Sequence, residues 1–131
     1  MSVVLENEFV TIEVVPEKKT VKHKFHKFIH GEVFRNALLA GRDAFIKNRC
    51  TKWLSDDRNN TVLTQEDLEW GKMNWEAELF KAGWKHWALV VPEKAIGQLS
   101  MNKLAEHYKS LGLNIQMFSN PDEAAAWLDK Q

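Results

Sequence analysis

The hydrophobic repeat of the chain changes at Gly31, and this change constrains the possible folds more than any other feature. Before Gly31, residues 9–15 and 20–28 alternate apolar and polar side chains on either side of a turn at residues 16–19. A two-residue repeat interrupted by a turn predicts a β-hairpin. After Gly31, apolar residues recur at helical spacing, and strand and helix patterns then alternate to the end. Strands joined by helices pair in parallel through right-handed crossovers, so the pattern predicts an α/β fold.

The segments after the hairpin define the rest of the predicted domain. Strand patterns occur at residues 52–55, 86–91 and 113–118, and helical patterns at residues 31–48, 65–82, 96–111 and 121–128. Residues 3–5 are a candidate for a short additional edge strand. We therefore predict one domain over residues 1–131, with a mixed four- to five-stranded sheet, an N-terminal β-hairpin and about four helices.

The charge balance limits the classes of partner. The 131 residues include 18 Lys and Arg and 18 Asp and Glu, so the formal net charge is zero. Nucleic acids and anionic membranes select basic surfaces, so we expect neither as the main partner. The single cysteine, Cys50, fits a reducing compartment. The N-terminus is not typical of a signal peptide, and no apolar run is long enough to predict a membrane span, so we expect a cytoplasmic protein.

The helix predicted at residues 65–82 is apolar on two faces. One stripe at helical spacing consists of Leu68, Gly71, Trp75, Leu79 and Ala82. A second stripe, roughly opposite, consists of Trp70, Met73, Ala77 and Phe80. A surface helix in a small domain needs only one apolar face to reach the core. The second face is therefore expected to cover a pocket, a partner subunit or a loop of the same chain.

Two predicted strands end in charged residues, where ligands of parallel sheets usually bind. Asp56, Asp57 and Arg58 follow one strand, and residues 92–94 follow another. Either aspartate is a candidate base, metal ligand or hydrogen-bond acceptor, and Arg58 is a candidate for binding an anion through two hydrogen bonds. The alternative is structural: Arg58 pairs with a neighbouring aspartate while the other aspartate fixes the turn.

Other chemical motifs give little support for catalysis. The chain has no glycine-rich phosphate loop, so no nucleotide cofactor is expected. His23 and His26 fall on opposite faces of a predicted strand, and we expect them, with His30, in solvent rather than in a metal site. Cys50 at the end of a helix is expected to be a small buried residue rather than a nucleophile. No metal, cofactor or catalytic residue is therefore predicted.

Several segments together resemble a known family. These are LSDDRN at residues 54–59, TQEDLEWGKMNW at 64–75 and AGWKHWALVVP at 82–92, with ENEFVTIEV and FSNPDEAAAWL near the two ends. They are similar to small bacterial STAS-like domains, related to the anti-sigma-factor antagonists of sporulation. The resemblance implies a four- to five-stranded mixed sheet with helices mainly on one side, and a relation to the CRAL-TRIO lipid-carrier fold.

The resemblance also implies where a phosphorylation switch would lie. Antagonists of that group carry a Ser or Thr after the central strand, at a helix N-terminus. The matching stretch here, residues 56–59, contains no hydroxyl, and Ser55, Thr61 and Thr64 lie outside the expected frame. Only Asp57 corresponds to the family pattern, as the acid before the turn, so no phosphorylation site is predicted.

Three functional hypotheses follow. The first is a non-enzymatic binding or regulatory module that acts by protein–protein interaction, as a homodimer or with another protein, through Trp70 and Phe80. The second is a carrier of a small apolar or lipid-like ligand, with Trp70, Met73 and Trp84 lining a pocket and Arg58 holding an acidic head group. The third is an enzyme that uses Asp56, Asp57 and Arg58, although no nucleophile or cofactor motif accompanies them.

Overall fold

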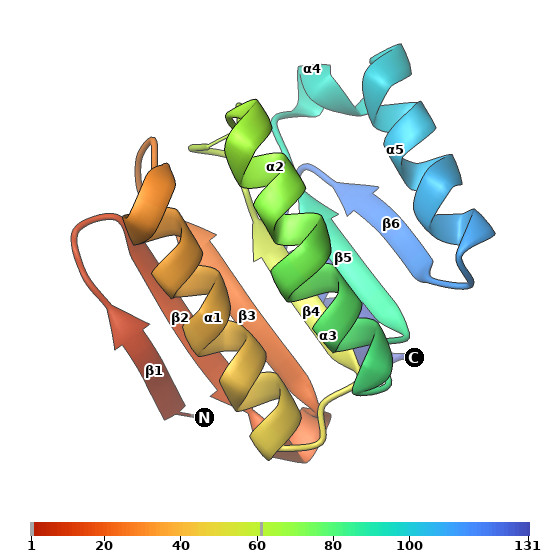
Figure 1. Cartoon of the computed structure of the whole chain (residues 1–131). Helices are drawn as coiled ribbons and strands as arrows, with labels where there is room; N and C mark the ends of the chain where they lie inside the picture. The colour runs from red at the N-terminus through yellow and green to blue at the C-terminus, as the bar shows by residue number, and fades with distance from the viewer. Residues whose placement is uncertain (1, 61) are drawn as a thin grey trace.

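The order of strands in the sheet is the same as their order in the chain. The computed structural model describes residues 2–60 and 62–131, and its six strands pair in the order β1-β2-β3-β4-β5-β6 (Figure 1). β1 to β3 pair antiparallel, whereas β3 to β6 pair in parallel. The strands are β1 (Ser2–Glu6), β2 (Val10–Val15), β3 (Thr20–Phe25), β4 (Lys52–Asp56), β5 (His86–Val90) and β6 (Asn114–Phe118).

The sequence prediction of a mixed α/β sheet with an N-terminal hairpin is confirmed, but the strand count is higher than the four to five expected. The additional strand is β1, which pairs with β2 across an irregularity between Val3 and Leu5. This irregularity interrupts the two-residue repeat within a strand of only five residues. The sequence therefore indicated residues 3–5 only as a candidate edge strand.

Helices cover the two faces of the sheet unequally. They are α1 (Gly31–Lys47), α2 (Gln65–Gly71), the π-helical segment η2 (Lys72–Glu76), α3 (Ala77–Lys81), α4 (Glu93–Ile96), α5 (Leu99–Ser110) and α6 (Pro121–Asp129), with a short 3-10 turn η1 (Pro16–Lys18). Right-handed crossovers between strands that advance in one direction place the connecting helices on the same face. Accordingly α1, α2–η2–α3 and α5 lie over one face, and the main core includes side chains from all three of these segments (Figure 1).

The last helix closes the opposite face. Ala124 and Leu128 of α6 pack with Leu54, Ala88 and Val90 of the central strands in a second, smaller core. Asn120 caps α6 by accepting the backbone N–H groups of residues 122 and 123, as its position before a proline predicts. The structure therefore has a thick helical layer on one side of the sheet and a single helix on the other.

The helices begin and end close to the predicted residues, with one exception. Thr64 accepts the Asp67 N–H at the start of α2, and Gly83 with φ of 100° follows the end of α3. The helix predicted at residues 96–111 corresponds to α5, which begins only at Leu99, and Ile96 instead ends the additional short helix α4, which Gly97 follows. A glycine lacks helix propensity, which explains the break.

None of the helices in the described part of the chain combines the length and the apolar character needed to span a membrane.

Candidate functional site

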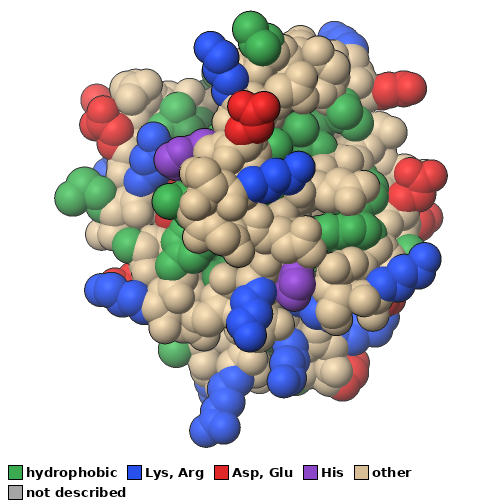
Figure 2. Space-filling model, turned by 90° about the vertical axis from the view of Figure 1, so that its right-hand side faces the viewer, with side chains coloured by type: hydrophobic (Ala, Val, Ile, Leu, Met, Phe, Trp, Pro, Cys, Tyr) green, Lys and Arg blue, Asp and Glu red, His purple; other side chains and the backbone are tan. Residues whose placement is uncertain are grey.

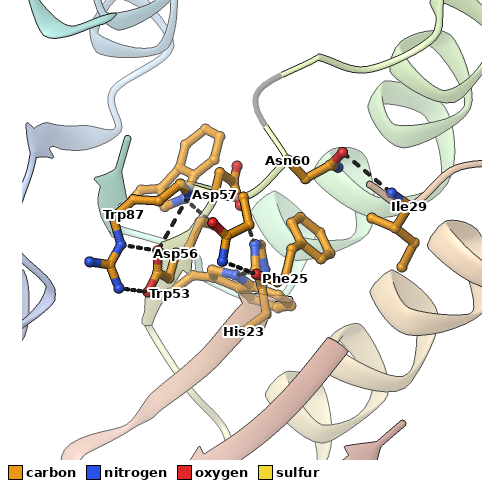
Figure 3. A network of polar contacts seen from close by, with 11 residues as sticks. His23, Phe25, Ile29, Trp53, Asp56, Asp57, Asn60 and Trp87 are labelled. Atoms are coloured by element: carbon orange, nitrogen blue, oxygen red, sulfur yellow. Dashed lines mark hydrogen bonds and ion pairs between the residues drawn. The ribbon is translucent and has the colours of Figure 1, made fainter. Parts of the chain in front are cut away.

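The charged residues predicted as a site lie at the end of β4, where Asp56 is the last residue of the strand and Asp57 and Arg58 follow it. Asp56 is buried, and both of its carboxylate oxygens accept hydrogen bonds from Arg58, at 2.9 Å from Nε and 2.8 Å from Nη2 (Figure 3). This bond raises the pKa of Arg58 above its ordinary value. The structural alternative for these residues, an ion pair between Arg58 and a neighbouring aspartate, is therefore the arrangement in the structure.

Asp57 is hydrogen-bonded to His23, a residue that was expected in solvent. Its Oδ1 lies 2.7 Å from Nε2 of His23, whose side chain is only 4% exposed. The indole N–H of Trp53 donates to Nδ1 of the same ring at 3.0 Å. Because Nδ1 accepts, we assign the ring proton to Nε2, where it is donated to Asp57. The expectation that His23 faces solvent was wrong.

The strand geometry explains this correction. Val21, His23 and Phe25 lie on the same face of β3, and that face carries the core. The ring of His23 also lies 4.4 Å from that of Phe25, centroid to centroid. Burying an imidazole lowers the stability of the fold little when both ring nitrogens are hydrogen-bonded, and here Trp53 and Asp57 are the two partners. His26, on the other face, is exposed as expected.

Hydroxyl groups near this end already serve as hydrogen-bond acceptors. Ser55 is completely buried, and its Oγ accepts the indole N–H of Trp87 at 2.8 Å. Thr64 accepts the Asp67 N–H as the cap of α2, and Thr61 lies outside the described residues. Ser55 is therefore out of reach of a kinase in the folded chain.

Two loops at this end are tied together by asparagines. The side-chain oxygen of Asn60 accepts the Ile29 N–H at 3.3 Å, and the amide of Asn59 donates to the carbonyl oxygen of Phe25 at 3.4 Å (Figure 3). Asn60 is 4% exposed, and its Nδ2 has no hydrogen-bond partner. The loop after β4 is thus held against the loop after β3.

Asp67 makes a second connection between these segments. Its carboxylate accepts the backbone N–H of Gly31 at 2.9 Å and Nε of Arg35 at 3.2 Å, so it caps α1 from α2. Asp67 is 1% exposed, whereas Leu68 is exposed, although the predicted stripe placed Leu68 toward the core. Because Asp67 faces α1 in order to cap it, the neighbouring Leu68 is turned toward the solvent. A polar hollow of about 340 Å³ lies beside it.

The residues of the predicted second apolar stripe lie on different sides of the helix. The guanidinium carbon of Arg35 on α1 lies over the ring of Trp70, 5.7 Å from its centroid. Trp70 is therefore on the side of its helix that faces α1. Four residues after Trp70, the carbonyl oxygen of Asn74 also accepts from α1, through Arg42. Phe80 is one turn after Glu76, which accepts the hydroxyl proton of Tyr108 on α5. Trp70 and Phe80 therefore lie on opposite flanks.

The π-helical turn η2 explains this separation. Gly71, Trp75 and Leu79 are buried at intervals of four residues. A strict four-residue repeat drifts around an α-helix of about 3.6 residues per turn, and a wider turn offsets the drift. The same widening rotates the residues before and after η2 to different sides.

The four residues proposed for an apolar pocket are also dispersed. Trp84 is buried, and its ring lies 5.3 Å from Trp75 and 5.1 Å from Trp87. Met73 is 76% exposed, and Arg58 is occupied by Asp56. The indole N–H groups of Trp75 and Trp84 are buried without partners. None of Trp70, Met73, Trp84 and Arg58 lines the polar hollow beside Asp67.

Exposed apolar side chains gather instead at the end of the molecule where the parallel strands finish. Large hydrophobic residues with substantial exposure there are Phe28, Val33, Val62, Leu68 and Leu99. They come from the loops after β3 and β4 and from the first turns of α1, α2 and α5, which Figure 1 shows at one end. We call these five residues the carboxyl-end surface. The spacing of residues in the sequence does not predict this surface, because no two of its members share a helical or strand repeat.

Other candidates for chemistry are separate from this end. Cys50 is a free, buried thiol, and burial raises its pKa to about 11, as fits the predicted small buried residue. Within residues 2–60 and 62–131, no group of three His, Cys, Asp or Glu side chains is arranged to hold a metal ion.

Comparisons with protein-family models, curated proteins and solved structures give no match to this chain. The resemblance to STAS-like domains therefore stays a prediction from the sequence.

Proposed function

We propose that this chain is a non-enzymatic binding module that pairs with a second copy of itself through the carboxyl-end surface. The observation that carries the proposal is the distribution of exposed apolar side chains. Of the ten large hydrophobic residues exposed in the described part of the chain, five belong to this surface. Scattered apolar residues are normal on a surface, whereas a concentration of them favours an interface.

The loops that carry this surface are held in place before any partner binds. Asn60 joins the loop after β4 to Ile29, and Asp67 joins α2 to Gly31. A surface that is ordered in advance loses less conformational entropy on association. The Asp56–Arg58 and Asp57–His23 pairs stabilise the same loop from inside, so the predicted site residues position the surface.

A second copy is the simplest partner for a chain with no net charge. Symmetric pairing is the commonest assembly, and little charge repulsion opposes it here. A standard interface buries about 800 Å² per partner. That is about a tenth of the 7350 Å² surface of this chain, so more than one of the five residues must take part.

No observation favours the apolar-ligand carrier or the enzyme as a second candidate. The residues proposed for the carrier pocket are dispersed, and both predicted acids are paired internally. Cytoplasmic location remains part of the proposal because it fits the single free cysteine.

Sedimentation equilibrium of the intact chain tests the proposal. Wild type should show a reversible species of twice the 15.2 kDa chain mass. Leu99→Asp, at the start of α5, should weaken this association by at least about tenfold, because a charge would be buried in the interface. Leu111→Asp is the matched control, since Leu111 is also exposed but follows the other end of α5. A monomer at every concentration, or equal effects of both substitutions, would contradict the proposal.

A further inference from the structure

Lysines gather at the opposite end of the sheet, where the parallel strands begin. Lys19 precedes β3, Lys52 begins β4 and Lys85 precedes β5. With Lys18 and His86 they line an open hollow of about 570 Å³, which we call the lysine hollow. Figure 2 shows Lys and Arg side chains gathered over the lower part of one side of the molecule, the end at which these strands start.

The backbone fixes the lysines beside one another. The N–H groups of Thr51 and Lys52 donate to the carbonyl oxygen of Lys19 at 3.0 and 3.1 Å. Those of Lys85 and His86 donate to the carbonyl oxygen of Thr51 at 2.9 and 3.1 Å. These bonds extend the parallel pairing and hold three lysines on neighbouring strand starts. Their proximity is therefore a property of the sheet.

The acids of the hollow are too few to neutralise it. Glu17 and Asp129 face four lysines, and Asp129 pairs with Lys18 at 3.1 Å. Lys52 donates to the carbonyl oxygen of Leu128, at the end of α6, which carries no full charge. Lys19 and Lys85 form no ion pair with any described residue. The hollow thus keeps a net positive charge in a chain that is neutral overall.

His86 responds to this excess of positive charge. Its pKa lies below the ordinary 6.5 because burial, Lys52 and Lys85 all disfavour the imidazolium. The side-chain amide of Asn114 lies 3.1 Å from Nδ1, and Gln131 binds the same amide. We assign the amide as donor to Nδ1, which leaves the proton of the neutral ring on Nε2.

We propose that the lysine hollow binds a compact multivalent anion of the phosphate class. Its volume lies within the range of about 300–1,000 Å³ that is typical of small-molecule sites. Lysine ammonium groups are common phosphate ligands, acting as point charges. A nucleic acid selects an extended basic surface, which the zero net charge of this chain does not favour, whereas a compact anion needs only the few lysines of this hollow. This site is independent of the carboxyl-end surface.

Titration of the intact chain with pyrophosphate at low ionic strength tests the proposal. Calorimetry should show saturable one-to-one binding, and Lys85→Gln and Lys19→Gln should each weaken it by about fivefold to tenfold. Lys94→Gln is the matched control, because Lys94 lies on α4 at the other end of the molecule, and it should leave the affinity unchanged. Exposed lysines tolerate this change, so all three variants should fold.

The imidazole of His86 provides a second readout by NMR. Its pKa should rise when pyrophosphate saturates the hollow, because the bound anion offsets Lys52 and Lys85. By linkage, His86 should contribute more to pyrophosphate affinity as the pH falls through this range, so the difference in affinity between wild type and His86→Gln should widen. The charged groups that line the hollow with His86 are Glu17, Lys18, Lys19, Lys52, Lys85 and Asp129.

Three results would overturn the proposal. One is the absence of saturable binding at millimolar pyrophosphate, and another is an equal loss of affinity in Lys94→Gln and Lys85→Gln. The third is tighter binding of succinate or of an oligonucleotide than of pyrophosphate, since either would assign the hollow to a different class of anion.

Discussion

The two ends of the parallel sheet each place a histidine beside charged groups, but with opposite arrangements. Where the strands finish, His23 is hydrogen-bonded to the carboxylate of Asp57 and to the indole of Trp53. Where the strands begin, His86 lies beside Lys52 and Lys85, and its pKa is lowered by burial and by these two lysines. At the first end Asp56, Asp57 and Arg58 are hydrogen-bonded to partners within the chain, whereas at the second end Lys19 and Lys85 form no ion pair with any described residue. Charged residues at a strand end can therefore be structural, and only those without internal partners indicate a ligand.

This difference predicts where substitutions destabilise the fold. The largest effect should come from His23→Ala, which removes a buried ring and leaves the Trp53 N–H without an acceptor. We expect a loss of about 3 kcal/mol in the free energy of unfolding, measured with urea. His26→Ala is the matched control on the exposed face of the same segment and should change stability by less than about 0.5 kcal/mol. Equal effects of the two would show that the His23 network is not structural.

The next largest effect on stability comes from comparing one charged residue at each end of the sheet. Arg58→Ala leaves the buried Asp56 carboxylate without its partner, and should cost about 1–2 kcal/mol. The cost stays below that of a fully buried pair because the Arg58 side chain is 37% exposed. Lys85→Ala, at the other end, should change stability by less than about 0.5 kcal/mol, since no ion pair is lost. A larger loss in Lys85→Ala would reverse the assignment of structural and binding roles.

The smallest effect is a dependence on pH. Because the pKa of His86 is lowered in the folded chain, the unfolded chain binds more protons near this pH. The contribution of His86 to stability is therefore present above pH 6.5 and is lost as the pH falls through the folded pKa. Urea unfolding at a series of pH values should show this decline in wild type and a shallower decline in His86→Gln. The same slope in both would contradict the lowered pKa of His86 in the folded chain.

Much of the fold could be predicted from the sequence because local rules determine it. The hairpin, the parallel strands, the Thr64 cap and the end of the helix at Gly83 follow from periodicity, capping and turn chemistry. The positions of Trp70 and Phe80 could not be predicted in this way. They depend on the π-helical turn η2, and no spacing rule for α-helices anticipates it.

The candidate sites depend on contacts between distant parts of the chain. The periodicity of β3 placed His23 on one face with Val21 and Phe25, but its partners are 30 and 34 residues away. The lysine hollow did leave a signal in the sequence. Lys19, Lys52 and Lys85 each stand at the start of a strand, and parallel strands bring such positions together.

Concentration-dependent NMR of the intact chain tests the pairing of copies at the carboxyl end most directly. Backbone amide spectra recorded at high and low protein concentration identify the residues that another copy contacts. We expect the shifted signals to fall on residues 26–33, 58–68 and 98–101, around Phe28, Val62 and Leu99. Shifts centred on Lys52, Lys85 and His86, or no shifts at all, would contradict it.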